Sequence, residues 1–132
     1  MRIGELARAT GTKAETIRYY EREGILPAAD RTDSNYRNYS DDHLATLTFV
    51  RRARELGFSM AQVRELLALS DHDEKPCQDV DRLVQQQLTE IERKIVDLTA
   101  LRDELGQMLR SCQADKIGEC QIIGSLGRHA IA

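Results

Sequence analysis

Three cysteines are the side chains of this 132-residue sequence best suited to bind a soft metal ion. Cys77 precedes a long stretch rich in leucine and charged residues, and Cys112 and Cys120 follow it. An odd number of cysteines does not suit a disulfide framework, and a reducing compartment keeps such residues as thiols. Their chemistry is therefore metal ligation or reaction with an oxidant.

The stretch 77–110 has to position these thiols, and its pattern predicts one continuous helix. Apolar residues recur every seven positions, and a second line lies three or four residues away with one charged interruption. No Gly or Pro occurs before Gly106, so the helix is roughly 50 Å long. The first line is Val84, Ile91, Leu98 and Leu105; the second is Leu88, Ile95, Arg102 and Leu109.

A helix of this length has too little chain around it to bury its apolar seam within one subunit. The seam therefore predicts a coiled coil with a second copy, and we expect an antiparallel homodimer. In that arrangement the start of one helix lies near the end of the other. Cys77 of one subunit would then meet Cys112 and Cys120 of its partner.

The first quarter of the sequence predicts a helix-turn-helix unit. A short helix over 3–10 ends at Gly11, and a second begins at Thr12 or Lys13 and ends at Gly24. Two short helices joined by a tight turn form the DNA-binding motif in which the second helix enters the major groove. The polar side of that second helix carries Thr16, Arg18 and Tyr19.

Residues 25–40 predict a small hairpin or loop, a wing beside the two helices. Pro27 and the sequence Asp-Ser-Asn at 33–35 favour turns, and aromatic and basic residues alternate after them. We expect Arg31, Tyr36 and Arg37 to contact DNA phosphates, and Tyr39 to pack the wing onto the helices.

Two further helices are expected before the long one. Ser40 caps the first of them, which ends near Gly57, and Phe58 and Ser59 open the second. We expect His43 to lie on the surface. The predicted domains are a winged helix-turn-helix head over 1–70, a linker over 71–76, the dimerisation helix over 77–110, and a metal-binding loop, short helix and tail over 111–132.

Composition favours a mostly α-helical protein over a sandwich or barrel, since charged residues are 31% and aromatic residues 5%. No apolar run reaches the ~18 residues of a membrane span, and the first residues lack a signal-peptide core, so we expect a cytoplasmic protein. The net charge of −3 divides into +1 over 1–56 and −4 over 57–132. This asymmetry favours DNA binding only weakly.

The motifs in this order resemble the MerR family of metal-responsive transcription regulators over essentially the whole chain. They are IGELA at 3–7, ETIRYYEREGIL at 15–26, NYRNY at 35–39, LTFVRRARELGFS at 47–59, and the cysteines at 112 and 120. The resemblance implies a dimer that sits on an overlong promoter spacer and represses it without metal. With metal, the dimer untwists the spacer so that RNA polymerase uses both promoter elements, which is control through DNA shape.

The resemblance also bears on the metal. Copper-group members have Ser at the position of Cys77, whereas a Cys there marks the group that senses zinc, cadmium, lead or mercury. Independently, three thiolates balance the charge of a divalent ion better than that of a monovalent one. Zinc regulators have a further Cys or a His in the loop, which this sequence lacks between 112 and 120. We expect Cd²⁺ or Pb²⁺ first and Hg²⁺ or Zn²⁺ next, with Cu⁺ behind them because the loop spacing also resembles the copper group.

Three other functions remain open at this stage. An enzyme with a reactive cysteine is disfavoured because no nucleophile–base motif or phosphate-binding loop is present. A coiled-coil adaptor explains 77–110 but not the arginine-rich head. A redox switch is the stronger rival, since the same thiols can oxidise to an intersubunit disulfide. His72 and His129 are possible auxiliary ligands that we leave outside the predicted site.

Overall fold

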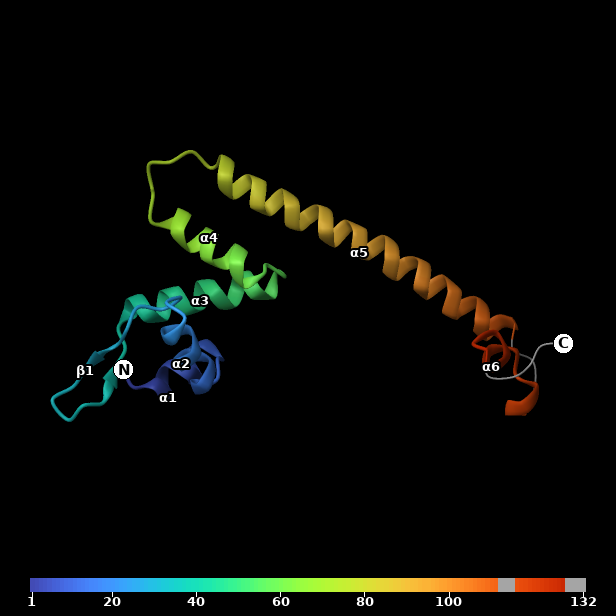
Figure 1. The fold of residues 1–132 in the computed structure, drawn as a ribbon, viewed down its shortest axis with the longest axis horizontal. Helices are drawn as coiled ribbons and strands as arrows, with labels where there is room; N and C mark the ends of the chain where they lie inside the picture. Colours follow the sequence, from blue (N-terminus) through green and yellow to red (C-terminus); the bar gives the residue numbers. More distant parts are fainter. Residues whose placement is uncertain (112–115, 128–132) are drawn as a thin grey trace. The chain divides into compact units, whose positions relative to one another are not determined.

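The computed structural model describes residues 1–111 and 116–127 of the chain, which is mostly α-helical (Figure 1). It divides into two units, Met1–Val84 and Gln85–Ala132. The first unit holds helices α1 to α4, a two-stranded sheet and the start of helix α5. The second holds the rest of α5, a 3-10 turn η1 and a short helix α6. Within the described residues, every helix is too short or too polar to span a lipid bilayer.

The predicted helix-turn-helix is confirmed as α1 (Ile3–Thr10) and α2 (Ala14–Arg22). Gly11 ends α1 in the left-handed conformation with φ of 63°. An ideal Cβ on Gly11 would lie 2.0 Å from Nη1 of Arg51, which donates a hydrogen bond to the carbonyl oxygen of Thr10. Glycine therefore suits the left-handed backbone here, and a side chain at this position would displace the Arg51 guanidinium from the Thr10 carbonyl oxygen.

The wing is also confirmed. Strands β1 (Asp30–Arg31) and β2 (Arg37–Asn38) pair antiparallel, with Arg31 opposite Arg37. Asn35 closes the turn at φ of 64°, a conformation that Asn tolerates better than most residues. The turn is held by the Thr32 N–H, which donates to the Tyr36 carbonyl oxygen at 2.8 Å.

Helix α3 (Asp41–Glu55) begins after Ser40, and α4 (Met60–Ser70) begins after Ser59, as predicted. The expectation for His43 was wrong, because its side chain is buried at 6% exposure. Its Nδ1 accepts the Ser40 N–H at 3.0 Å, and its Nε2 lies 2.9 Å from the Pro27 carbonyl oxygen. His43 thus takes the place of the Glu or Gln of a capping box and also ties α3 to the chain entering the wing.

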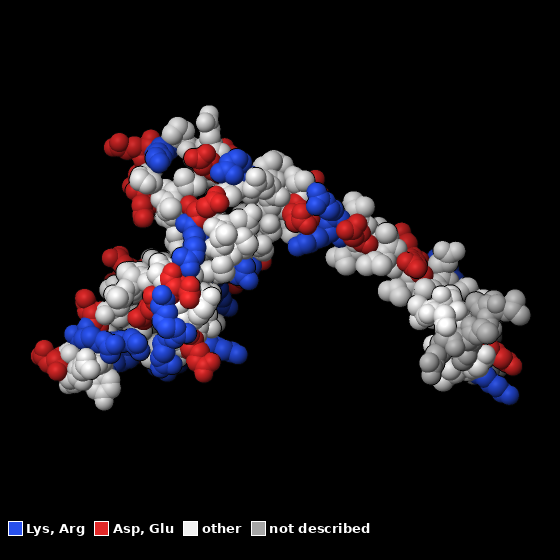
Figure 2. Space-filling view, in the orientation of Figure 1, with Lys and Arg blue, Asp and Glu red and all other residues white. Residues whose placement is uncertain are grey.

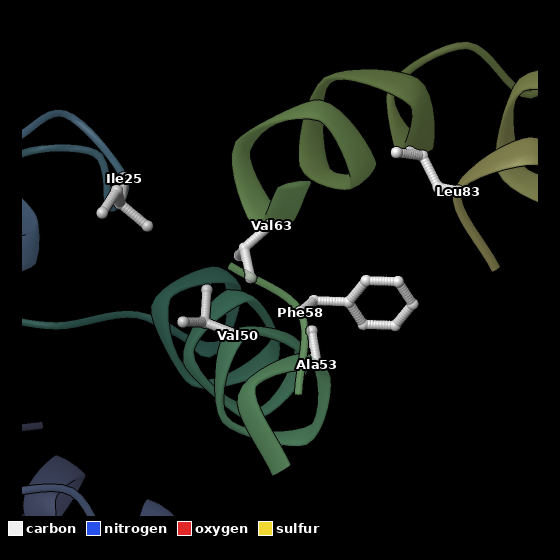
Figure 3. Packing of buried hydrophobic residues seen from close by; sticks show 6 residues of the cluster. All are labelled: Ile25, Val50, Ala53, Phe58, Val63 and Leu83. Carbon is white, nitrogen blue, oxygen red and sulfur yellow. The ribbon is translucent and has the colours of Figure 1, made fainter. Parts of the chain in front are cut away.

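Two clusters of apolar side chains form the core of the first unit. One joins α1, α2, the wing and α3 through Leu6, Ile17, Leu26, Tyr39 and Leu47. The other joins α3, α4 and the first turns of α5 (Figure 3) through Ile25, Val50, Ala53, Phe58, Val63 and Leu83. Leu83 is 2% exposed, so the start of α5 packs as part of the first unit.

Helix α5 (Gln78–Ser111) is continuous over 34 residues, which confirms the predicted long helix to within one residue at each end. Its predicted seam is exposed within this chain: Ile91 is 37% and Leu109 is 74% accessible, and the other apolar seam residues lie between. After it come η1 (Ile117–Glu119) and α6 (Gln121–Ser125). Such a long exposed apolar stripe favours burial against a partner helix.

Candidate nucleic-acid interface and metal centre

The outer side of α2 carries the three residues predicted to face DNA. Arg18 is exposed, Tyr19 is 46% exposed and Thr16 is half-buried, whereas Ile17 on the opposite side is fully buried. The Arg22 guanidinium lies 5.9 Å from the centre of the Tyr19 ring, a distance that favours a cation–π contact. The amphipathic character of α2 therefore presents these side chains outward.

The wing residues meet Arg18 of α2 around one hollow of about 190 Å³. Tyr36 is 58% exposed, and the Arg31 Nη1 donates to the Asn35 carbonyl oxygen at 3.2 Å. The hollow is lined by Arg2, Ile3, Arg18, Arg31, Asn35, Tyr36 and Arg37. Four of the six predicted DNA-contact residues thus lie together, while Thr16 and Tyr19 lie outside this hollow on α2.

Arg2 also lines this hollow, although it was not among the predicted DNA-contact residues. Its guanidinium lies 4.3 Å from the centre of the Tyr36 ring. Arg2 precedes α1, where a single basic residue carries no signal, and only the fold brings it to the wing. Four arginines around one hollow suit the negative charge of a nucleic-acid phosphate.

Basic side chains gather over the wing and the adjoining helices, with acidic side chains among them (Figure 2). Glu21 of α2 is an acidic residue next to the wing, and its side chain is 12% exposed. The Tyr39 hydroxyl donates to its Oε1, and the Arg37 Nε lies 3.7 Å from its Oε2. Burial, followed by the hydrogen bond to Glu21, raises the pKa of Tyr39 to about 12. Tyr39 therefore remains a hydrogen-bond donor to Glu21 well into alkaline pH.

Two of the three predicted metal ligands lie at helix starts. Cys77 is exposed, and its carbonyl oxygen accepts the Asp81 N–H at 2.8 Å in the first turn of α5. Cys120 is half-buried, and its carbonyl oxygen accepts the Gly124 N–H at 3.1 Å at the start of α6. Cys112 lies outside the described residues and directly follows α5 in the sequence.

The described part of one chain contains no group of three or more His, Cys, Asp or Glu side chains placed to hold a metal ion. Its thiols nevertheless have the donor chemistry that soft ions prefer. Cys77 is exposed to solvent, so a ligand from a second subunit has access to it. By their donor chemistry the described cysteines therefore suit a soft metal ion.

Two family models match the chain. A model of the MerR helix-turn-helix regulatory proteins matches residues 1–70, and a model described as MerR, DNA binding, matches residues 44–108. Together the two models cover the head and nearly all of α5. They therefore include both the arginine-lined hollow of the head and the exposed apolar seam of α5.

Curated proteins and solved structures match over nearly the full length. The heavy metal-dependent transcription regulator 2 of Rhizobium meliloti is 41% identical over 93% of this chain and 84% of its own length. The mercuric resistance operon regulatory protein of Bacillus cereus is 41% identical over 95% and 96%. The crystal structure of the regulator PbrR691 from Ralstonia metallidurans in complex with lead(II) is 40% identical, with a TM-score of 0.81 and coverage of 96% and 98%. The chain belongs to the MerR family of metal-responsive transcription regulators, and is a DNA-binding regulator rather than an enzyme.

Proposed function

We propose that this protein is a homodimeric repressor and activator of a heavy-metal resistance promoter, switched by a divalent soft metal ion. The observation that carries the proposal is the placement of thiols at both ends of a long helix with an exposed apolar seam. Cys77 directly precedes α5, and Cys112 directly follows its last residue in the sequence. An antiparallel pair of such helices brings one end of each beside the other end of its partner.

In the proposed site, Cys77 of one subunit and Cys112 and Cys120 of the partner bind one ion. Three sulfur ligands favour Cd²⁺ or Pb²⁺ first, with Hg²⁺ and Zn²⁺ next. The relatives described as mercuric and as lead-bound support a soft divalent ion. Metal would join the loop of one subunit to the start of the other subunit's α5, whose Leu83 packs in the head.

DNA binding is assigned to α2 and the wing of each subunit. Thr16, Arg18 and Tyr19 would face the major groove, and Arg31, Tyr36 and Arg37 the flanking phosphates. We propose that metal rotates the two heads, which changes the twist of the promoter spacer and lets RNA polymerase engage it. Metal would then control transcription by changing the shape of the promoter DNA and not by creating new contacts with bases.

A copper(I) sensor is the second candidate, supported by the seven residues that separate Cys112 from Cys120. Two of the thiols suffice for linear coordination of Cu⁺, so that sensor does not need Cys77.

The test is transcription in vitro from a promoter that contains DNA selected by the purified protein from random duplexes. The reduced protein should repress without metal and activate with Cd²⁺ or Pb²⁺, and Cys77→Ser should repress normally without activating. Activation by Cu⁺ in Cys77→Ser would favour the copper sensor, and activation by an oxidant with no metal would favour a redox switch. A protein that selects no DNA would refute the proposal as a whole.

A further inference from the structure

Glu21 of α2 is an acidic residue next to an arginine of the wing, and its side chain is 12% exposed. It lies beside the arginine-lined hollow to which DNA binding is assigned, since Arg37 both lines that hollow and pairs with Glu21. Its negative charge repels phosphates and on electrostatic grounds alone weakens DNA binding. A carboxylate in this place is expected to have a compensating role.

The two carboxylate oxygens of Glu21 have different partners. Tyr39, at 2% exposure, is fixed in the core, and its hydroxyl donates to Glu21 Oε1. The carboxylate is therefore anchored, and its second oxygen lies 3.7 Å from the Arg37 Nε. The Arg37 side chain is 37% exposed, so part of it reaches solvent while its Nε pairs with Glu21.

A guanidinium has N–H groups on more than one edge, so Arg37 can bind Glu21 through Nε and a phosphate through its other N–H groups. A long side chain loses rotamer freedom when it binds a ligand, and holding it in advance reduces that loss. The hydrogen bond from Tyr39 to Glu21 and the ion pair between Glu21 and Arg37 thus connect the core to the edge of the arginine-lined hollow.

We propose that Glu21 is a positioning residue for DNA binding, which holds Arg37 ready for a backbone phosphate. This inference rests on the proposed function, because it requires that the wing binds DNA. It goes further in assigning an acidic residue of α2 a favourable role in binding an anion.

The inference predicts a change in DNA affinity for Glu21→Gln that is opposite in direction to the change expected from simple electrostatics. Glu21→Gln keeps an oxygen that accepts the Tyr39 hydroxyl but removes the charge that holds Arg37. Loss of a negative charge at the surface would by itself strengthen binding to DNA. If Glu21 positions Arg37, the same substitution weakens binding.

The experiment measures the dissociation constant of the full-length protein for a duplex selected by the wild type, over a range of salt concentrations. Glu21→Gln should bind about threefold more weakly, the size expected of a partly exposed ion pair. Arg37→Ala should lower the slope of log affinity against log salt by about 1, and Glu21→Gln should shift the slope toward that value. In the Arg37→Ala background, Glu21→Gln should have no further effect.

Glu15→Gln is the matched control, because Glu15 is an exposed acid on the same helix. It should bind as the wild type does, or slightly more tightly. Glu21→Gln that binds equally or more tightly would overturn the inference. Two other results would also overturn the inference: weaker DNA binding by Glu21→Gln with an unchanged salt slope, or weaker binding when Glu21→Gln is made in the Arg37→Ala background. Either result would mean that Glu21→Gln lowers DNA affinity by changing the structure of the head and not through Arg37.

Thermal unfolding of Glu21→Gln checks that the variant folds. A second measurement does not depend on the folding of Glu21→Gln: in the wild type the Arg37 Nε–H should give an ordered NMR signal without DNA, assigned by its loss in Arg37→Lys. A signal averaged by free rotation would refute the positioning role. If the wild type selects no DNA, the proposed function itself is wrong. If the wild type selects DNA but Glu21→Gln binds it with unchanged affinity, only this inference is wrong.

Discussion

His43 joins three parts of the head through one imidazole ring. It accepts the Ser40 N–H, lies 2.9 Å from the Pro27 carbonyl oxygen and packs edge-on against Tyr39, with ring centres 5.3 Å apart. Because Nδ1 is the acceptor, Nε2 carries the hydrogen that is donated to Pro27. The ring therefore satisfies buried polar groups on two segments.

We expect His43→Ala to lower the free energy of unfolding by about 2 kcal/mol, because it leaves the Ser40 N–H and the Pro27 carbonyl without their partner. Urea denaturation of the metal-free protein measures the change. His72→Ala is the matched control, since His72 is exposed in the loop after α4, and it should unfold as the wild type does. Equal stability of the two variants would show that the ring contributes nothing.

Tyr39 stabilises the head, and this contribution to stability is lost at alkaline pH. Its pKa is raised from 10.0 to about 12 by burial and by Glu21. A raised folded-state pKa adds stability below the unfolded value, and that stability is lost as pH rises through the folded value. The stability difference between the wild type and Tyr39→Phe should therefore shrink between pH 10 and 12. A constant difference in denaturation midpoint over that range would contradict this.

At the scale of single elements, local sequence signals predicted most of the helix ends. Gly11, Ser40 and Ser59 act where glycine and serine are known to end or begin helices, and each does so in the structure. His43 was misplaced because its partner on Pro27 lies 16 residues away in the chain, and no local pattern reports that contact. Arg2 was missed for the same reason.

The turn between α1 and α2 needs glycine for two separable reasons. Gly11 and Gly24 both have a left-handed backbone conformation, with φ of 63° and 74°. A Cβ at Gly11 would in addition overlap the Arg51 guanidinium, whereas a Cβ at Gly24 would have no atom within 4 Å. We expect Gly11→Ala to cost about 2 kcal/mol of stability and Gly24→Ala about 1 kcal/mol. The difference should disappear in an Arg51→Ala background. Equal costs in the wild-type background would show that the contact with Arg51 is immaterial.

The heptad pattern predicted the seam of α5 but not the whole of its packing. Leu83 lies off both predicted lines and yet packs in the core of the first unit, because the first turns of α5 serve the head. A periodicity shows which residues share a face of a helix, but it does not identify the element that covers that face.

We expect Leu98→Glu to dissociate the proposed dimer, because it places a charge in the apolar seam, where Leu98 is 64% exposed in the single chain. Sedimentation of the metal-free protein measures the effect. Ala100→Glu adds the same charge two residues away on the other side of the helix and should leave a dimer. A monomeric wild type, or equal behaviour of both variants, would contradict the antiparallel pairing.

At the scale of the whole molecule, the order of elements carried more information than any one motif. The family and the fold were predictable because head, long helix and loop cysteines occur together in one short chain. The arginine-lined hollow itself was not predicted, although four of the predicted DNA-contact residues, Arg18, Arg31, Tyr36 and Arg37, lie around it. The metal was not predictable to the same degree, because several soft ions bind the same thiols.

The proposed three-thiolate site can be tested by a competitive titration of the reduced protein with Cd²⁺, Pb²⁺, Zn²⁺, Hg²⁺ and Cu⁺. Ultraviolet thiolate-to-metal bands and native mass spectrometry report the ion and its stoichiometry. We predict one tightly bound Cd²⁺ or Pb²⁺ per subunit, lost in Cys77→Ser, because the site needs all three sulfurs. A preference for Cu⁺ that survives Cys77→Ser, or no tight binding of any ion, would contradict the three-thiolate sensor.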